Sequence, residues 1–332
     1  MPFFVHKIGY NEKGLNKNCK TRKKYFEKAK KYATIGEDTM DAVCRFATYA
    51  DFTMEKPFDL AKHSSIGCGG FADVVFYPKT VDETARLIKK LKADAIPYYV
   101  VGNMTNVLPL DGRCEKAIVC LKNLSGIVVG EETFAYAGVL GGALLRACKG
   151  AGKSGLEFLK GIPCTLGGAL YMNAGVRGAY MDGVVRNVLV LRNGEKRVLS
   201  WKECAFSYKH SVFMDTDDII LGATLRLKNA DVEDVEEREN AYMERRAHLP
   251  KGKSMGCVFK NPVGAVAGDL IEKSGLKGLR VGGAVVSEKH ANFIINDKSA
   301  SARDIVALIT LIKNAVYAQY GVKLEEEIRY LT

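Results

Sequence analysis

The sequence contains no long apolar run. Over its 332 residues, no apolar stretch approaches the roughly 18 residues that a membrane-spanning helix needs, and residues 1–10 lack the apolar core of a signal peptide. These absences predict a cytoplasmic protein without a membrane span. The chain also has no internal repeat and no low-complexity segment.

Common signatures of metal, disulfide and nucleotide sites are missing as well. The nine cysteines include no C-x-x-C pair, and their number is odd. We therefore expect no metal site and no disulfide framework, and predict reduced thiols that mostly pack in the core. No glycine-rich segment fits the Walker pattern, and none fits G-x-G-x-x-G between a strand and a helix, which points away from P-loop and Rossmann folds.

Positive charge is concentrated near the N-terminus. The chain carries a net charge of +11, of which residues 7–31 contribute +8, with ten Lys or Arg against two Glu. A solvated helix face explains this pattern, and attraction to nucleic acid or a membrane surface is the alternative. No recognition motif accompanies the charge, so we predict no nucleic-acid partner.

Turn and periodicity signals divide the chain into three parts. Residues 1–58 form a basic, partly helical N-terminal extension, residues 59–228 form a strand-rich region with two halves that meet near residue 122, and residues 229–332 form a smaller domain. Expected strands span residues 72–77, 97–101, 117–121, 133–137, 184–191, 196–200, 219–227 and 326–331. Capping boxes predict helix starts at Thr80 and Ser301, further helices cover residues 141–150 and 232–249, and Asn193-Gly194 predicts a hairpin.

Residues 155–175 combine five glycines and one proline in 21 positions. A core strand would not contain so many glycines, because each weakens it, whereas glycine lets a ligand approach the backbone closely. A second glycine turn, residues 102–106, follows the strand expected at 97–101. Free backbone N–H groups in such turns bind anions. Each turn alone is more often a simple connection, but together they indicate a diphosphate site.

Two further clusters contain groups that can transfer protons. Cys257 lies beside Gly256 and near Lys260, and is either a buried thiol in an apolar strand or a thiol whose pKa is lowered by positive charge. Near the C-terminus, strand alternation places Glu325 and Glu327 on one face and Glu326 on the other. Considered alone, this acidic segment is more often a solvated edge than a site.

These motifs, in this order, resemble the UDP-N-acetylenolpyruvoylglucosamine reductase family, the MurB-type flavoenzymes of peptidoglycan precursor synthesis, in its shorter subtype. The resemblance runs from about residue 61 to residue 331 and leaves residues 1–58 outside. It rests on six segments: residues 64–73, 101–108, 155–175, 206–213, 245–262 and 324–329. It implies an α+β fold, with a two-part FAD-binding unit of the PCMH/VAO type over residues 59–228 and a smaller α/β substrate domain over residues 229–332.

The resemblance also implies the reaction. NADPH would reduce FAD, hydride would pass to C3 of the enolpyruvyl ether of UDP-N-acetylglucosamine enolpyruvate, and an acid would protonate C2 to give UDP-N-acetylmuramate. Hydride addition places charge beside the substrate carboxylate, so cations and acids are needed there. The flavin would supply the redox chemistry. The expected partners are a small UDP-sugar and NADPH, and the expected state is a monomer.

Site residues carried over from the family fall into three groups. The catalytic residues would be Lys209, Cys257 and Glu327. The cofactor-binding residues would be Gly102, Asn103, Met104, Thr105, Asn106, Gly161, Ile162, Pro163, Thr165, Gly168, Asn173 and Gly175. The substrate-binding residues would be Tyr208, Arg245, His248, Lys260, Asn261 and Arg329.

Five of these positions depart from the family pattern. Lys209 replaces an Arg, Cys257 a Ser and His248 a Lys, while Met104 and Cys164 each replace a Gly. Lys keeps the charge but loses the bidentate geometry of Arg, and Met104 is expected to crowd a pyrophosphate. These changes leave two alternatives open: a non-catalytic homologue that binds flavin or a UDP-sugar, and an FAD oxidase acting on another substrate.

Overall fold

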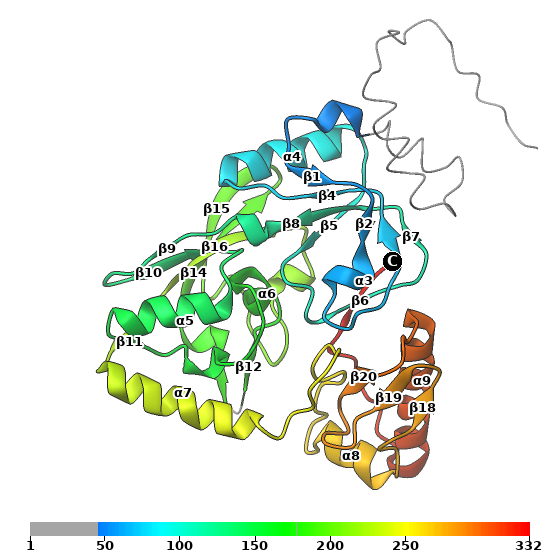
Figure 1. Ribbon diagram of the computed structural model, residues 1–332. Coiled ribbons are helices and arrows are strands. Elements are labelled where there is room, and N and C mark those ends of the chain that lie inside the picture. The colour runs from blue at the N-terminus through cyan, green and yellow to red at the C-terminus, as the bar shows by residue number, and fades with distance from the viewer. Residues whose placement is uncertain (1–45, 177) are drawn as a thin grey trace, which may run out of the picture. The chain divides into compact units, whose positions relative to one another are not determined.

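The computed structural model describes residues 46–176 and 178–332, and Figure 1 shows how their helices and strands are arranged. The basic segment of residues 7–31, with most of the expected N-terminal extension, lies outside these residues. In the described part of the chain, no helix is long and apolar enough to cross a membrane. The same residues contain no group of His, Cys, Asp and Glu side chains that could hold a metal ion.

A mixed four-stranded sheet forms the first part of the fold (Figure 1). Its strands, in spatial order, are β1 (Met54–Glu55), β4 (Val75–Phe76), β8 (Ala117–Cys120) and β5 (Tyr98–Val101). Strand β8 pairs in parallel with β4 and β5, and helix α4 (Val81–Ala93) lies between these two in the chain. Thr80 caps α4 by accepting from the N–H of Glu83, but the Glu83 carboxylate accepts from Lys79. The expected capping box is therefore only half formed.

Two expected boundaries in this region are wrong. Strand β1 falls within the expected N-terminal extension, yet Met54 pairs with Phe76, so residue 58 is too late an end for that extension. The strand expected at residues 72–77 is two strands in different sheets, because β3 (Phe71–Ala72) pairs with β2 (Phe58–Asp59) and β7 (Arg113–Cys114). Asp73 and Val74 separate β3 from β4.

A five-stranded antiparallel sheet forms the second part. Its strands, in spatial order, are β15 (Glu195–Ser200), β14 (Val185–Arg192), β16 (Ile219–Leu225), β10 (Thr133–Tyr136) and β9 (Ile127–Val128). Asn193 and Gly194 join β14 to β15 with φ angles of +53° and +84°. This left-handed backbone is what a two-residue hairpin requires, and it confirms the predicted hairpin.

Helix α6 (Leu166–Tyr171) packs on this sheet, and helices α5 (Gly141–Gly150) and α7 (Val232–Arg246) pack on each other. Figure 1 shows α7 alongside α5, and Glu239 of α7 pairs with Lys149 of α5 and with Lys160. The domain boundary expected at residue 229 is therefore too early. Short pairs complete this part: β11 (Lys153–Ser154) with β17 (Lys228–Asn229), and β12 (Gly175–Val176) with β13 (Ala179–Tyr180).

The C-terminal part is a three-stranded antiparallel sheet with two helices. Its elements are α8 (Ala267–Lys273), β18 (Arg280–Val281), β19 (Ala284–Val286), β20 (Ile294–Asn296) and α9 (Ala302–Tyr320). The predicted capping box at Ser301 is present, and Gly321 ends α9 in the left-handed conformation. The predicted apolar face of α9 is fully buried, from Ile305 to Val316.

The C-terminal strand returns the chain to the first part, within one compact unit of Thr48–Thr332. Strand β21 (Arg329–Leu331), shorter than expected, pairs in parallel with β6 (Val107–Pro109). Just before it, Glu326 bridges to Phe259 of the C-terminal part. This crossing places Glu327 between the C-terminal part and the turn of residues 102–106.

Candidate active site

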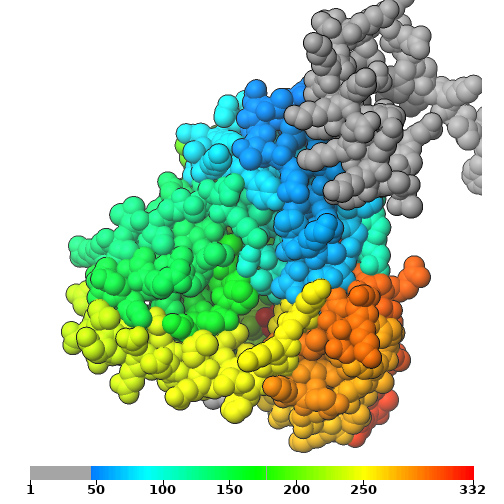
Figure 2. Space-filling view, viewed as in Figure 1, coloured from blue at the N-terminus to red at the C-terminus, as the bar shows by residue number. Residues whose placement is uncertain are grey.

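A cleft of about 1740 Å³ lies where these parts meet. Its lining includes both glycine turns, the end of α7, and residues of the 252–261 and 325–331 segments. Figure 2 shows a hollow between the green, yellow and blue surfaces, with red atoms from the C-terminal end of the chain inside it. The volume exceeds the roughly 300–1,000 Å³ of a pocket for one small ligand, so a dinucleotide and a second ligand can share it.

The two glycine turns form one continuous surface. A Cβ on Gly102 would lie 2.1 Å from Thr165 Oγ1, so only glycine allows this close approach. The side-chain amide of Asn103 donates a hydrogen bond of 2.7 Å to the carbonyl of Pro163. The structure thus brings together two turns about 60 residues apart in sequence, as their composition predicted.

The first turn presents free backbone donors. The N–H groups of Asn103, Met104 and Thr105 have no hydrogen-bond acceptor among the described residues. Successive N–H groups of this kind form a concavity that binds phosphate oxygens. The donor set therefore fits the diphosphate of a dinucleotide cofactor.

Met104 does not crowd this turn, contrary to the expectation from sequence. Its φ angle is +47°, the left-handed conformation for which a Gly is suited, but its side chain is only 4% exposed. It packs in a hydrophobic cluster with Val101 and Leu331. Burial of an apolar side chain contributes about 1.5–3 kcal/mol, which offsets a left-handed strain of about 1–2 kcal/mol.

Cys164 is accommodated in the second turn. It does not adopt a positive φ, whereas Gly161 in the same turn has a φ of +74°. The Cys164 sulfur lies 3.1 Å from where a Cβ on Gly141 would be, and the Gly141 N–H donates to the Cys164 carbonyl at 2.9 Å. Burial raises the pKa of this thiol to about 11, so it is neutral. Glycine at the start of α5 makes room for the sulfur.

Asn173 lies behind the cleft wall rather than on it. Its side chain is 2% exposed, and both ends of its amide are used within the protein. Its Nδ2 donates to the Ser207 carbonyl at 2.9 Å, and its Oδ1 accepts from the Asp182 N–H at 3.0 Å. A direct cofactor contact by this side chain is therefore not supported, and Asn173 instead holds the turn that carries Lys209.

Strand packing, rather than a cofactor, explains why residue 175 is glycine. A Cβ there would lie 2.2 Å from the Ala179 carbonyl of the β12–β13 pair. The remaining expected cofactor residues line the cleft: Thr105, Asn106, Ile162, Pro163, Thr165 and Gly168. Of these, Thr165 uses its hydroxyl to cap α6, accepting from Gly168 at 3.3 Å. Asn106 donates to the Glu327 carbonyl at 3.0 Å.

The three expected catalytic residues come together although they are far apart in sequence. The ammonium of Lys209 lies 2.9 Å from a carboxylate oxygen of Glu327, and both side chains are largely buried, at 17% and 13% exposed. Lys209 stands in a tight turn between Ser207 and His210, with a φ of +55°. The Glu327 N–H donates to the Val258 carbonyl at 2.8 Å, which places Glu327 beside Cys257.

The electrostatics of this cluster favour a charged ion pair and a neutral thiol. Burial lowers the pKa of Lys209, but Glu327 and Cys257 outweigh burial, and the net pKa is raised. Burial and the Glu327 charge raise the pKa of Cys257 to about 12, against the opposing effect of Lys209 and Arg246. Of the two alternatives that the sequence left open for Cys257, the lowered pKa is therefore wrong. A protonated thiol is nevertheless the form that can donate a proton.

The expected substrate residues differ in how firmly they are held. Lys260 pairs with Glu325 at 2.6 Å, and the Tyr208 hydroxyl accepts from the Asn261 N–H at 3.3 Å. Asn261 Oδ1 also accepts from Ala267 at 3.0 Å, at the start of α8. Arg329 lies 5.7 Å from the ring of Tyr171. Arg245 and His248 line the cleft with exposed side chains.

Sequence reasoning missed Arg246. Its guanidinium is half-buried, with its Nε 3.0 Å from where a Cβ on Gly161 would be, and burial lowers its pKa against the effect of Cys257 and Cys164. Among the described residues no carboxylate pairs with it. Helical periodicity could have found it, because residues 235 and 239 are the buried positions of α7 and residue 246 lies two turns further on the same face.

The comparisons with known proteins agree with this geometry. Residues 72–195 match the FAD binding domain family, and residues 247–331 match the C-terminal domain of UDP-N-acetylenolpyruvoylglucosamine reductase. The UDP-N-acetylenolpyruvoylglucosamine reductase of Clostridioides difficile is 37% identical, over 85% of this chain and 93% of the relative. That of Geobacter metallireducens is 40% identical, over 81% and 91%.

A solved structure has the same fold. The crystal structure of UDP-N-acetylenolpyruvylglucosamine reductase from Thermus caldophilus matches with a TM-score of 0.74 and 34% identity, and the match covers 85% of this chain and all of that one. Similarity of this extent, with the cofactor turns and the Lys209, Cys257 and Glu327 cluster in one cleft, shows that the chain belongs to the UDP-N-acetylenolpyruvoylglucosamine reductase family.

Proposed function

We propose that this protein reduces UDP-N-acetylglucosamine enolpyruvate to UDP-N-acetylmuramate, using FAD as its bound cofactor and NADPH as reductant. One observation carries the proposal: the buried Lys209–Glu327 ion pair and the protonated thiol of Cys257 line the same cleft as the two joined glycine turns. Hydride transfer to an enolpyruvyl ether needs a cation near the carboxylate and an acid near the neighbouring carbon.

The residues present fit FAD. The free N–H groups of Asn103, Met104 and Thr105 would hold its diphosphate, with the turn of residues 161–168 as the second wall. When bound there, FAD would supply the redox chemistry that links NADPH to the substrate. Because Met104 turns its side chain into the core, the turn keeps the backbone conformation that the phosphate contacts require.

Lys209 and Glu327 would act on the carboxylate end of the substrate. Lys209 stays charged through the neutral range, since its pKa is raised, and offers a cation to the charge that develops beside the carboxylate. A single ammonium lacks the bidentate geometry of a guanidinium, so we propose that the neighbouring Arg246 contributes further positive charge to the same cleft.

Cys257 would donate the proton to C2. The overall reaction then consumes one NADPH and one proton, with hydride added at C3 and the proton at C2 of the enolpyruvyl group. Because the Cys257 pKa is raised to about 12, the thiol holds its proton at every physiological pH. The Glu327 charge raises that pKa, and the charges of Lys209 and Arg246, which act in the opposite direction, would assist the transfer.

The non-catalytic alternative and the oxidase alternative gain no support. Two of the five departures, Met104 and Cys164, are accommodated by packing. A third, Lys209, keeps the positive charge and pairs with the largely buried carboxylate of Glu327. The cytoplasmic location and the monomeric state stay predictions.

Following the two half-reactions by flavin absorbance tests the proposal. NADPH should bleach the flavin, and the enolpyruvyl substrate should restore its colour. Glu327→Gln and Cys257→Ala should each slow the substrate-dependent step by at least tenfold and leave the NADPH step within about threefold, while Glu195→Gln, on exposed β15, should leave both steps unchanged. Protein that binds no FAD, or a flavin that reoxidises only with oxygen, would contradict the proposed function.

A further inference from the structure

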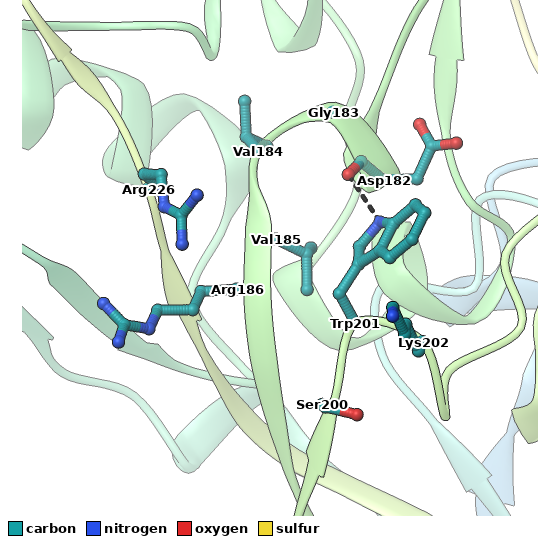
Figure 3. Close-up of a pocket in the computed structure, with 9 residues that line it drawn as sticks. All are labelled: Asp182, Gly183, Val184, Val185, Arg186, Ser200, Trp201, Lys202 and Arg226. Carbon is teal, nitrogen blue, oxygen red and sulfur yellow. Dashed lines mark hydrogen bonds between the residues drawn. The ribbon is translucent and has the colours of Figure 1, made fainter.

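A second pocket, of about 450 Å³, lies outside the cleft at one end of the five-stranded sheet, and Figure 3 shows the residues that line it. It is formed by the residues leading into β14, those at the end of β15, and Arg226, which follows β16. None of its lining residues lines the cleft. The proposed reduction therefore leaves this pocket unexplained.

The pocket contains the only tryptophan of the chain. Trp201 is 46% exposed, although its indole N–H donates to the Asp182 carbonyl at 2.9 Å and its backbone N–H donates to the Arg186 carbonyl at 3.1 Å. Among the described residues, no aromatic ring or cation stacks on the indole. A large aromatic side chain is thus held in a fixed orientation with a free face toward solvent.

Three cations accompany the indole: Arg186, Lys202 and Arg226. Arg186 pairs with Glu132, whereas Lys202 and Arg226 have no carboxylate partner in the described part of the chain. Figure 3 shows both guanidinium groups on one side of β14 and the indole on the other, with Val185 between them. Asp182 also lines the pocket, but its carboxylate points away beyond the indole in this view.

The backbone of β14 is irregular at this point. Its pairing with β16 shifts register between Val185 and Asn187, so that Arg186 lies outside the regular ladder. Such irregularities redirect side chains and are common beside binding sites. The pocket therefore combines an apolar floor, a fixed aromatic face and two guanidinium groups.

We propose that this pocket binds a nucleoside monophosphate, with the base stacked on Trp201 and the phosphate held by Arg226 and Arg186. Guanidinium groups bind phosphate oxygens in a bidentate geometry, and any of the nucleobases can stack on an aromatic face. Arg186 has five donors and can keep Glu132 while it binds phosphate. The volume lies within the range of about 300–1,000 Å³ for small-ligand pockets.

The single tryptophan makes a direct experiment possible. AMP is titrated into the full chain with its bound flavin, at low ionic strength, and Trp201 fluorescence is recorded. We expect saturable quenching by AMP, with little effect from adenosine or inorganic phosphate alone. Arg226→Gln should weaken AMP binding at least tenfold, and Lys202→Gln should weaken it less.

Lys228→Gln is the matched control, because it removes one exposed positive charge two residues away from Arg226 and outside the pocket lining. It should bind AMP as the wild type does. Absence of quenching up to millimolar AMP, equal affinity in Arg226→Gln and Lys228→Gln, or quenching by inorganic phosphate as strong as by AMP would overturn the proposal. So would a change in flavin absorbance that accompanies quenching equally in all variants, because it would place AMP in the cleft.

Discussion

Replacing Asn173 tests how the Lys209 turn is held. Asn173→Ala removes the hydrogen bond to the Ser207 carbonyl, which belongs to the turn that carries Lys209, and the bond from the Asp182 N–H. It also places alanine at a φ of +41°, where Asn is better tolerated. The Ser207–His210 turn then loses the Asn173 bond to its first residue, while the neighbouring Ser211 hydroxyl keeps its bond to the Tyr171 carbonyl.

The magnitude follows from these contacts. Each lost hydrogen bond costs about 0.5–1.5 kcal/mol, and the left-handed backbone of alanine adds about 1 kcal/mol. The free energy of unfolding should therefore fall by about 2–4 kcal/mol, and Tm by on the order of 5–10 °C. Asn173→Gly loses the same bonds without the strain, so its loss should be about 1 kcal/mol smaller.

Asn173→Ala should slow the two flavin half-reactions to different extents. A displaced Lys209 no longer lies 2.9 Å from Glu327, so the substrate-dependent reoxidation of the flavin should slow at least tenfold while reduction by NADPH stays within about threefold. Stopped-flow flavin absorbance measures both steps on one sample. Because Asn173 Nδ2 does not reach the cleft, FAD content should stay near one per chain.

Asn296→Ala provides a matched control. Asn296 is also a buried amide that joins separate segments, donating to Ile66 and Gly67 at 3.0 and 3.1 Å and accepting from Ala300 at 2.7 Å. It does not line the cleft, so it should lower Tm without a selective effect on reoxidation. Equal slowing of both half-reactions by Asn173→Ala, or the same selectivity in Asn296→Ala, would refute the positioning role.

Three further predictions concern the cofactor turn and the catalytic cluster. Gly102→Ala should lower the FAD content of purified protein severalfold, because its Cβ would lie 2.1 Å from Thr165 Oγ1. Adding Thr165→Ala to this variant should partly restore the FAD content. Full FAD occupancy in Gly102→Ala alone would contradict the contact. Cys257 should react with iodoacetamide at pH 8 about 1,000-fold more slowly than an ordinary thiol, because its pKa is raised from 9.0 to about 12. Glu327→Gln should speed this reaction, because it removes a charge that raises the pKa. Site-resolved mass spectrometry measures both rates, and a rate typical of free thiols would be inconsistent with a raised pKa. The Lys209 pKa is raised above 10.5, so the stability that its charge contributes is complete below pH 10.5 and is lost as pH rises further. The difference in the free energy of urea unfolding between wild type and Lys209→Gln should therefore be constant from pH 7 to 9 and shrink above pH 10.5. A decline that begins near pH 8 would argue against the raised pKa.

Local signals in the sequence predicted most elements correctly where one segment decides the outcome. The Asn193-Gly194 hairpin, helix α5 and the capped helix α9 depend on neighbouring residues only, and they form as predicted. The strand expected at residues 72–77 divides instead, because its two halves find partners in different sheets. Helix α7 packs on α5 through Glu239, a contact between residues 90 apart that no local pattern reveals.

The same distinction applies to the site. Sequence alone determined which residue types line the cleft, because the glycine turns and the motifs around Lys209, Cys257 and Glu327 are readable one segment at a time. Tertiary structure alone decided that Asn173 supports the Lys209 turn instead of touching a cofactor, and that the Cys257 pKa is raised rather than lowered. These outcomes depend on distance and burial between segments far apart in the chain, and both quantities exist only once the chain has folded.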